Sequence, residues 1–289
     1  MKLVTFAYHD ETRIGILVSK NGQAHVLDLN CATSLPMDMV QFLQAGDAAM
    51  TAAQNAVAEV DERFLIPQSD VILLAPLLRP GKIICIGYNY RGHTSAALPT
   101  HPDIFAKLSN VVIGPHQPIV ITRTSQMVDY EGELAVVMGK RCKYVDQAHA
   151  LDVVAGYTIF NDVTARDFQK RTSQWLLGKS FDTYGPLGPA IVTKEEIPDP
   201  SNLDLSLTLN GKEMQHSNTC DMIFPVPYLI ECITQALTLE PGDIISTGTP
   251  SGTGASYNPP VFMKPGDEVC VRIDKIGELV NPVVSESFD

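Results

Sequence analysis

The pattern of hydrophobic and polar residues changes character near residue 75. Before this point, short apolar segments separated by polar turns indicate strands at residues 3–8, 14–18 and 25–29. Asn21-Gly22 is a strong hairpin signal, and an alanine-rich amphipathic stretch at residues 47–60 predicts a helix. We therefore expect residues 1–75 to form a small N-terminal α/β domain.

Longer apolar runs follow and predict a larger domain over residues 80–289. A buried strand is expected at residues 82–87, and an apolar helix at residues 226–237. Asp146 has the position of an N-cap for a helix that runs through Val154 and stops at Gly156. Further strands are expected at residues 105–107, 111–113, 119–121, 157–160, 203–209, 244–247 and 268–273.

The stretch at residues 129–139 combines a strand pattern with a row of acids. Residues two apart in a strand share a face, so Asp129, Glu131 and Glu133 should project together. The apolar residues that follow indicate entry into a core, where ionised carboxylates repel one another unless positive charge lies nearby. A hard divalent cation would supply that charge. The alternative is an edge strand whose acidic face is solvated.

A second polar group follows the strand expected at residues 157–160. Asn161 and Asp162 stand where this strand gives way to a loop, a place where ligand-binding residues are common. If a helix begins near Thr164, Arg166 and Gln169 share the face directed toward Asp162 and could bind a carboxylate and a second polar group. The alternative is that Arg166 only pairs with a neighbouring acid.

Three further segments carry candidate chemistry. Lys179 has apolar neighbours, and a partly buried lysine must be paired, either with a structural acid or, as we favour, with the acidic cluster. His93 lies in a polar loop after a core strand and could act as a general base. The hydroxyl-rich turn around Thr249 could hold a carboxylate or could be only a turn.

Charge and composition narrow the possible partners. The formal net charge of -12 argues against nucleic acid and anionic membranes as partners. Acidic residues interrupt the N-terminal segment, and no apolar run approaches the length of a bilayer span. These features predict a cytoplasmic protein.

Five motifs, in order, resemble those of the fumarylacetoacetate hydrolase family, and the likeness extends over about residues 80–284. It is closest to the family's domain-containing protein 2 subgroup, on account of residues 174–179 and 186–189. The motifs are Gly87-Tyr88-Asn89-Tyr90 with His93, Glu131-Gly132-Glu133, the run from Asn161 to Gln169, Gly178-Lys179-Ser180-Phe181-Asp182, and Thr247-Gly248-Thr249-Pro250.

The resemblance implies an α+β fold, a mixed β-sandwich roll, that is usually a homodimer. It implies that Glu131, Glu133 and Asp162 bind Mg²⁺ or Mn²⁺ and that Lys179 stabilises an enolate. It further assigns His93 to a lid as the catalytic histidine. The residues that it assigns to substrate binding are Tyr90, Arg166, Gln169 and Thr249.

The activity implied is metal-dependent hydrolysis of a C–C bond in acylpyruvate-like 2,4-diketo acids, with a metal-bound enolate as the leaving group. Hydrolytic members commonly carry a glutamate three residues after the lid histidine, and this chain has Ala96 there. Decarboxylation of oxaloacetate, or tautomerisation or isomerisation of 2-keto acids, depends less on a base that activates water. These activities are therefore the alternative, and a binding protein that keeps the metal site without turnover is a third hypothesis.

Overall fold

Strand β11 (Gly132–Met138) is the central element of the fold, and both of its faces are buried. The computed structural model describes residues 1–92 and 98–287. Leu134 and Met138 pack into a core between the two main sheets, whereas Ala135 and Val137 pack into a second core on the opposite face. Burial on both faces explains why this strand is continuously apolar after its acids.

The larger sheet comprises twelve strands among the described residues, and in it β11 pairs with β12 (Val154–Asn161) and β17 (Ile244–Ser246). The order along the sheet is β4-β3-β2-β1-β14-β12-β11-β17-β6-β7, with β5 on β1 and β8 on β14. The other strands of this sheet are β1 (Lys2–Tyr8), β2 (Glu11–Lys20), β3 (Gln23–Asp28), β4 (Leu65–Pro67), β5 (Ile72–Leu73), β6 (Ile83–Gly87), β7 (Asp103–Lys107), β8 (Val112–Ile113) and β14 (Gly185–Thr193).

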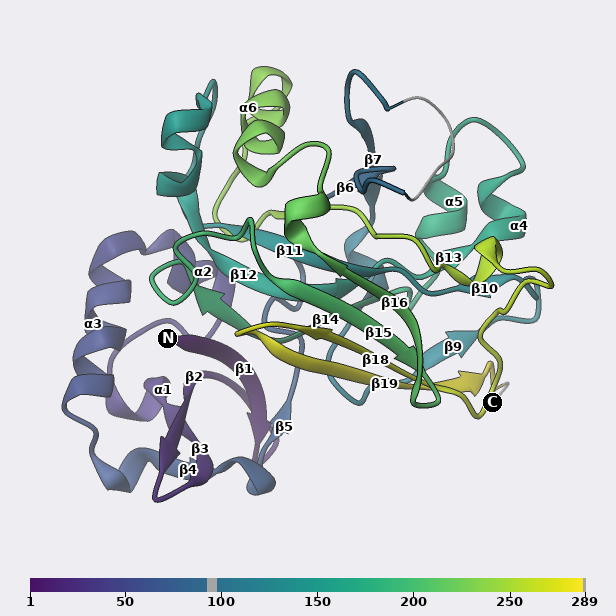
Figure 1. The fold of residues 1–289 in the computed structure, drawn as a ribbon. Helices are drawn as coiled ribbons and strands as arrows, with labels where there is room; N and C mark the ends of the chain where they lie inside the picture. The colour runs from purple at the N-terminus through teal and green to yellow at the C-terminus, as the bar shows by residue number, and fades with distance from the viewer. Residues whose placement is uncertain (93–97, 288–289) are drawn as a thin grey trace.

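A second sheet, with the order β16-β15-β18-β19-β9, is stacked on one face of the first (Figure 1). Leu207 and Val271 from this sheet share a core with Leu134 of β11. The α+β fold and mixed β-sandwich predicted from the sequence are thus confirmed. The strands are β9 (Ile119–Ile121), β15 (Asp204–Leu209), β16 (Lys212–Asn218), β18 (Glu268–Ile273) and β19 (Gly277–Ser285), and a separate ribbon pairs β10 (Val128–Asp129) with β13 (Thr164–Ala165).

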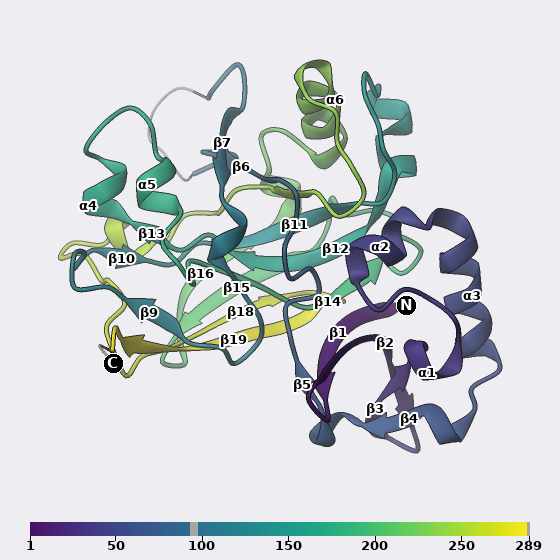
Figure 2. The same ribbon diagram turned by 180° about the vertical axis from the view of Figure 1, so that it is seen from behind.

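The helices are short and lie around the sheets. Figures 1 and 2 both show α4 and α5 side by side at the end of the molecule that carries β10 and β13. The α-helices are α1 (Leu29–Ala32), α2 (Met39–Gln44), α3 (Gly46–Ala58), α4 (Arg166–Gln169), α5 (Leu176–Lys179) and α6 (Val226–Ala236). The 3-10 helices are η1 (Glu62–Phe64), η2 (Gln68–Asp70), η3 (Ser109–Val111), η4 (Gln147–Val153), η5 (Thr219–Asp221) and η6 (Gly254–Ser256).

The N-terminal unit joins the larger sheet along one strand. Lys2 of β1 stands opposite Val192 of β14, and Phe42 of α2 lies in the same core as Ala135. The strands and the helix predicted in this unit are present. The domain boundary near residues 75–80 stays a prediction, and the unit shares both a sheet and a core with the rest of the chain.

The helix predicted from Asp146 to Gly156 is wrong in its C-terminal part. Asp146 does cap a helix, since its carboxylate accepts the His149 backbone N–H at 3.0 Å, but η4 ends at Val153 and β12 begins at once. Gly156 lies within β12, where a Cβ atom would be 2.2 Å from the Val192 carbonyl oxygen. This glycine permits close strand packing and does not end a helix.

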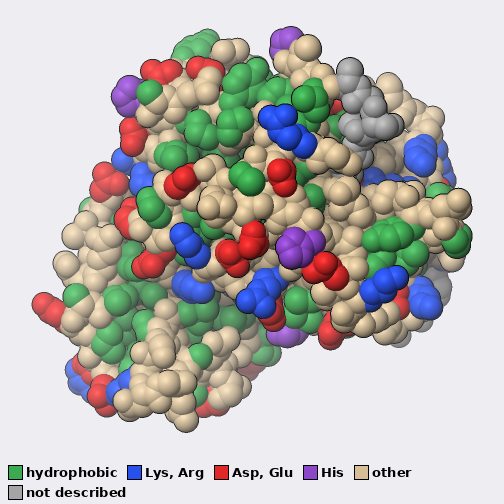
Figure 3. All heavy atoms as spheres, viewed as in Figure 1, with side chains coloured by type: hydrophobic (Ala, Val, Ile, Leu, Met, Phe, Trp, Pro, Cys, Tyr) green, Lys and Arg blue, Asp and Glu red, His purple; other side chains and the backbone are tan. Residues whose placement is uncertain are grey.

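The surface shown in Figure 3 carries acidic and basic side chains that are interspersed. In the part of the chain that the structure describes, we find no helix with the length and hydrophobicity needed to cross a bilayer.

Candidate active site

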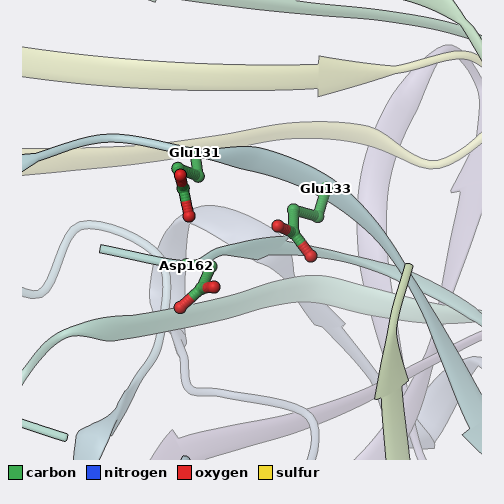
Figure 4. Close-up of side chains that lie close together, drawn as sticks. All are labelled: Glu131, Glu133 and Asp162. Carbon is green, nitrogen blue, oxygen red and sulfur yellow. The ribbon is translucent and has the colours of Figure 1, made fainter. Parts of the chain in front are cut away.

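The pairing of β11 with β12 brings three carboxylates together. Glu133 stands opposite Phe160, and just beyond the paired residues the Asp162 N–H donates to the Glu131 carbonyl oxygen at 2.9 Å. The side chains of Glu131, Glu133 and Asp162 therefore point into one space (Figure 4). One carboxylate oxygen from each lies within 4.8 Å of the others.

All three carboxylates are buried. The exposed fractions are 6% for Glu131, 2% for Glu133 and 0% for Asp162. Because β11 is a central strand covered on both faces, the alternative of an edge strand with a solvated acidic face is wrong.

Asp129 does not join this cluster, contrary to the expectation that it shares a face with Glu131 and Glu133. β10 ends at Asp129 and β11 begins only at Gly132, so the strand alternation is interrupted between them. The Asp129 carboxylate instead accepts hydrogen bonds from Arg166 Nε at 2.8 Å and from the Gly254 N–H at 2.7 Å.

Basic side chains surround the carboxylates. Lys179 Nζ lies 2.5 Å from both Glu131 Oε2 and Asp162 Oδ2, which confirms that this lysine meets the acidic cluster. Lys107 Nζ lies 2.6 Å from Asp162 Oδ1, and Arg166 donates to Glu131 Oε1 at 2.6 Å. Asp129 and Glu133 bring the acids in this group of described residues to four, and the bases number three. The group therefore carries one excess negative charge when all seven side chains are ionised.

Among these four described acids, Glu133 is the one with no basic side chain bonded to it. Burial, together with Asp162 and Glu131, raises the pKa of Glu133 well above its usual value, and its hydrogen bonds come from the neutral Ser246 hydroxyl at 2.5 Å and Gly248 N–H at 2.9 Å. Burial acts in the same direction on Glu131, but Arg166 and Lys179 outweigh it and lower that pKa. Glu133 is therefore the carboxylate that most needs an added cation.

The donor set fits a hard divalent cation. Carboxylate oxygens are the ligands that Mg²⁺, Mn²⁺ and Ca²⁺ prefer, and a charge of +2 would turn the single excess negative charge into a single excess positive one. A centre of that kind would attract an anionic ligand despite the net negative charge of the chain.

A cavity of about 340 Å³ opens over the three carboxylates. Arg166 and Gln169 line it from α4, and Arg166 donates to Gln169 Oε1 at 3.1 Å, as their shared helical face predicts. Thr249 also lines the cavity, with its hydroxyl donating to the Gly132 carbonyl oxygen at 2.9 Å. The structure thus gathers these three residues, and Lys179, around one space.

One residue predicted to bind substrate, Tyr90, lies in the core and not in this cavity. Tyr90 is only 1% exposed and packs in the core between the sheets, while Tyr88 lines the cavity beside Trp175 and Phe105. The sharp turn after β6 explains the difference, since Tyr88 has a φ of 55° and redirects the chain. His93 lies outside the described residues.

Sequence reasoning missed Lys107 and the aromatic wall formed by Tyr88, Phe105 and Trp175. Lys107 is 3% exposed and ends an apolar strand, so the burial argument that singled out Lys179 applies to it as well. The aromatic wall depends on packing between distant segments, with ring centroids 5.2 Å apart for Phe105 and Trp175, and no local pattern indicates it.

Comparison with known proteins identifies the family. The family model described as fumarylacetoacetate (FAA) hydrolase C-terminal matches residues 82–284. The chain belongs to the fumarylacetoacetate hydrolase family. Oxaloacetate tautomerase FAHD2A, mitochondrial, from Bos taurus is 46% identical over 274 residues, which are 93% of this chain and 86% of the relative. The fumarylacetoacetate hydrolase domain-containing protein 2 homolog of Dictyostelium discoideum is 41% identical, covering 98% and 97%.

Similar solved structures cover nearly the whole chain. A fumarylacetoacetate hydrolase from Exiguobacterium antarcticum superposes with a TM-score of 0.87 at 34% identity, covering 99% of this chain and 100% of its own. A maleylpyruvate hydrolase from Sphingobium sp. SYK-6, in complex with manganese(II) and pyruvate, gives 0.83 at 30% identity with the same coverage. The family and subgroup predicted from the sequence are confirmed, and the chain is an enzyme of this family.

The predicted cytoplasmic localisation is wrong. The bovine, rat and human relatives, which are named oxaloacetate tautomerases, all bear names that place them in mitochondria. The prediction depended on the absence of a recognisable signal peptide, and that absence does not identify a compartment.

Proposed function

We propose that this protein is a divalent-metal-dependent enzyme of small 2-keto acids that interconverts the keto and enol forms of oxaloacetate. The observation that carries this proposal is the buried group of Glu131, Glu133 and Asp162, with Lys179 in contact at the base of an open cavity. The names of the bovine and other animal relatives support the choice of oxaloacetate.

Glu131, Glu133 and Asp162 would hold the metal, either Mg²⁺ or Mn²⁺. When bound, such an ion polarises a keto group and stabilises negative charge on its oxygen. The chain's own groups would act beside it. Lys179 is held as a cation by two carboxylates, so its ammonium group would stabilise the same developing charge and would not act as a base.

The cavity wall would bind and orient the acid. Arg166, Gln169 and Thr249 stand around the opening and offer a guanidinium, an amide and a hydroxyl to ligand oxygens. Tautomerisation moves a proton between carbon 3 and the keto oxygen, so a group must accept and return that proton. His93 remains the residue predicted for this role.

Hydrolysis of a C–C bond in an acylpyruvate-like acid is the second candidate. It is favoured by the likeness to maleylpyruvate hydrolase. It requires an activated water, and Ala96 stands where hydrolytic members commonly carry the glutamate that orients the histidine. We rank tautomerisation first, with decarboxylation of oxaloacetate as another possible outcome at the same site, because neither needs that water.

The deciding experiment follows three reactions in parallel with Mg²⁺, with Mn²⁺ and with EDTA. Ultraviolet absorbance follows the enol of oxaloacetate, release of carbon dioxide follows decarboxylation, and loss of acetylpyruvate follows hydrolysis. We expect metal-dependent acceleration of enol loss. Rapid loss of acetylpyruvate without any effect on the enol would instead favour the hydrolase.

Two variants make this test specific. Lys179→Met should lower kcat/KM by about 100- to 1000-fold, the usual scale for removing one group that stabilises developing charge. Lys212→Met removes an exposed lysine in a hairpin and should leave the rate unchanged. Equal rates for both variants would contradict the assigned role of Lys179.

The homodimer implied by the family likeness stays a prediction, which measurement of molar mass in solution would test.

A further inference from the structure

Asp129 is the acid of the 129–133 row that the metal cluster leaves out, and it is completely buried. Its Oδ1 accepts the backbone N–H groups of Tyr130 at 2.9 Å and Gly254 at 2.7 Å. Its Oδ2 accepts the Ala255 N–H at 3.0 Å and Arg166 Nε at 2.8 Å. One carboxylate therefore joins the strand, a distant turn and the cavity arginine.

Arg166 retains donors for a ligand after these contacts. A guanidinium has five N–H groups. The structure describes one bond from Nε to Asp129, one from a terminal nitrogen to Glu131, and one from the other terminal nitrogen to Gln169. Within this described set, one N–H on each terminal nitrogen remains, and these two donors can serve the oxygens of a ligand carboxylate.

The turn held by Asp129 forms part of the same cavity wall. Thr253, Ala255 and Ser256 line the cavity, and η6 (Gly254–Ser256) is tied to Asp129 by its first two backbone N–H groups. A Cβ atom at Gly254 would lie 2.7 Å from Asp129 Oδ1 and 1.9 Å from the Val261 carbonyl oxygen. The glycine thus permits the close approach that brings the turn onto this carboxylate.

We propose that Asp129 is a positioning residue that holds the Arg166 guanidinium and the 253–256 turn together as a binding wall for a carboxylate of the 2-keto acid. This inference deepens the proposed function and rests on it. Asp129 does not touch the substrate or the metal in this arrangement. It acts through Arg166, because the bond at Nε sets the plane of the guanidinium and so the direction of its two remaining N–H groups.

Asp129→Asn tests this role with little change in volume. With its oxygen toward Tyr130 and Gly254, the asparagine would present its amide nitrogen to Arg166 Nε and the Ala255 N–H donor to donor. The bond to the guanidinium would be lost, while the turn would keep its bond from Gly254. Asp243→Asn is the matched control. Asp243 is also buried, with Lys82 Nζ at 2.6 Å and the Glu240 N–H at 2.8 Å, and it does not line the cavity.

Calorimetric titration with Mn²⁺, and then with oxalate in saturating Mn²⁺, separates the two possible roles of Asp129. We expect Asp129→Asn to bind Mn²⁺ within a few-fold of the wild-type affinity and oxalate about 10- to 100-fold more weakly, the usual scale for loss of a supporting hydrogen bond. KM for oxaloacetate should rise more than kcat falls. Asp243→Asn should change neither affinity.

Coupling to Arg166 gives a second readout. If Asp129 acts through the guanidinium, Arg166→Met should weaken oxalate binding, and adding Asp129→Asn to that variant should weaken it no further. Additive losses would overturn the proposal. It would also be overturned by wild-type oxalate affinity in Asp129→Asn, by parallel loss of metal and oxalate, or by a wild-type protein that binds no oxalate in Mn²⁺. If the wild type binds both ligands but does not convert oxaloacetate, only the proposed function fails.

Discussion

Individual buried charges in this protein are each matched to a different kind of partner. Asp129 and Glu131 share Arg166, Asp162 lies between two lysines, and Glu133 receives only neutral donors. A buried ion without a counter-charge is costly, so the local imbalance at Glu133 favours binding of a cation over the empty site.

Glu133→Gln should abolish most of the metal affinity and leave the metal-free protein intact. The amide keeps the shape and can still accept from Ser246, but it contributes no negative charge. We expect calorimetric titration to show Mn²⁺ binding about 100-fold more weakly or worse, beyond the roughly 10- to 100-fold scale for loss of a supporting residue. The Tm measured in EDTA should not decrease. Glu195→Gln, at an exposed position, is the control, and unchanged Mn²⁺ affinity in Glu133→Gln would exclude this residue as a ligand.

Lys107→Met should destabilise the metal-free protein more than the metal-bound one. Lys107 is buried between Asp162 Oδ1 and the Val163 carbonyl oxygen, 2.9 Å away, so its loss leaves buried acceptors without a donor. Breaking a buried pair costs about 3–5 kcal/mol. Urea unfolding in EDTA should show this loss, and saturating Mg²⁺ should recover part of it by supplying charge to Asp162. An equal loss with and without Mg²⁺ would contradict the coupling.

At this scale the sequence predicted the residues whose chemistry is local to one segment. The spacing of Glu131 and Glu133, the position of Asp162 at a strand end, and the single lysine in an apolar run were sufficient. The role of Asp129 was not predictable, because it depends on a break between β10 and β11 and on a turn more than a hundred residues away.

Among the elements, β11 contributes to the core on one face and carries a predicted metal ligand on the other. Leu134, Val136 and Met138 build the core between the sheets, and Glu133 lies on the other face with Ala135, which stands opposite Ser246. The small residues beside Glu133 leave room for polar side chains in an otherwise apolar layer. Stability and ligand binding should therefore respond to different substitutions in the same strand.

Leu134→Ala should mainly lower stability, and Ser246→Ala should mainly weaken metal binding. Leu134→Ala removes a fully buried side chain and should lower the free energy of unfolding by about 2–5 kcal/mol, with little change in metal affinity. Ser246→Ala removes the hydroxyl bound to Glu133 and should weaken Mn²⁺ binding by about 10-fold or more, with a smaller effect on unfolding. Denaturant unfolding and calorimetry measure the two quantities, and a common pattern in both variants would show that the two faces are not independent.

Element types were predictable where the pattern was long, as for α6 and the strands around the site. The segment at residues 146–156 was not, because Gly156 has the residue type of a helix stop but its contact with the Val192 carbonyl belongs to strand packing. The sequence alone does not show whether a glycine ends a helix or makes room for a neighbouring strand.

At the scale of the whole molecule, one sheet joins the N-terminal unit to the strand that carries the carboxylate cluster. β1 extends the sheet that contains β11, and residues from α2 and α3 fill the core beneath that sheet. Cores shared in this way tend to unfold together, so a ligand bound at the carboxylates should stabilise the N-terminal unit as well.

Removal of the metal tests this continuity. The single tryptophan, Trp175, lines the cavity, whereas far-ultraviolet circular dichroism reports on all the strands. Binding at 100 times Kd contributes about 2.7 kcal/mol, so Mg²⁺ should raise Tm by about 4–5 °C relative to EDTA. Both probes should give the same midpoint in each condition, since β1 is hydrogen-bonded to β14 within one sheet. A second transition seen only by circular dichroism and unaffected by Mg²⁺ would instead show that the N-terminal unit folds independently of the metal centre.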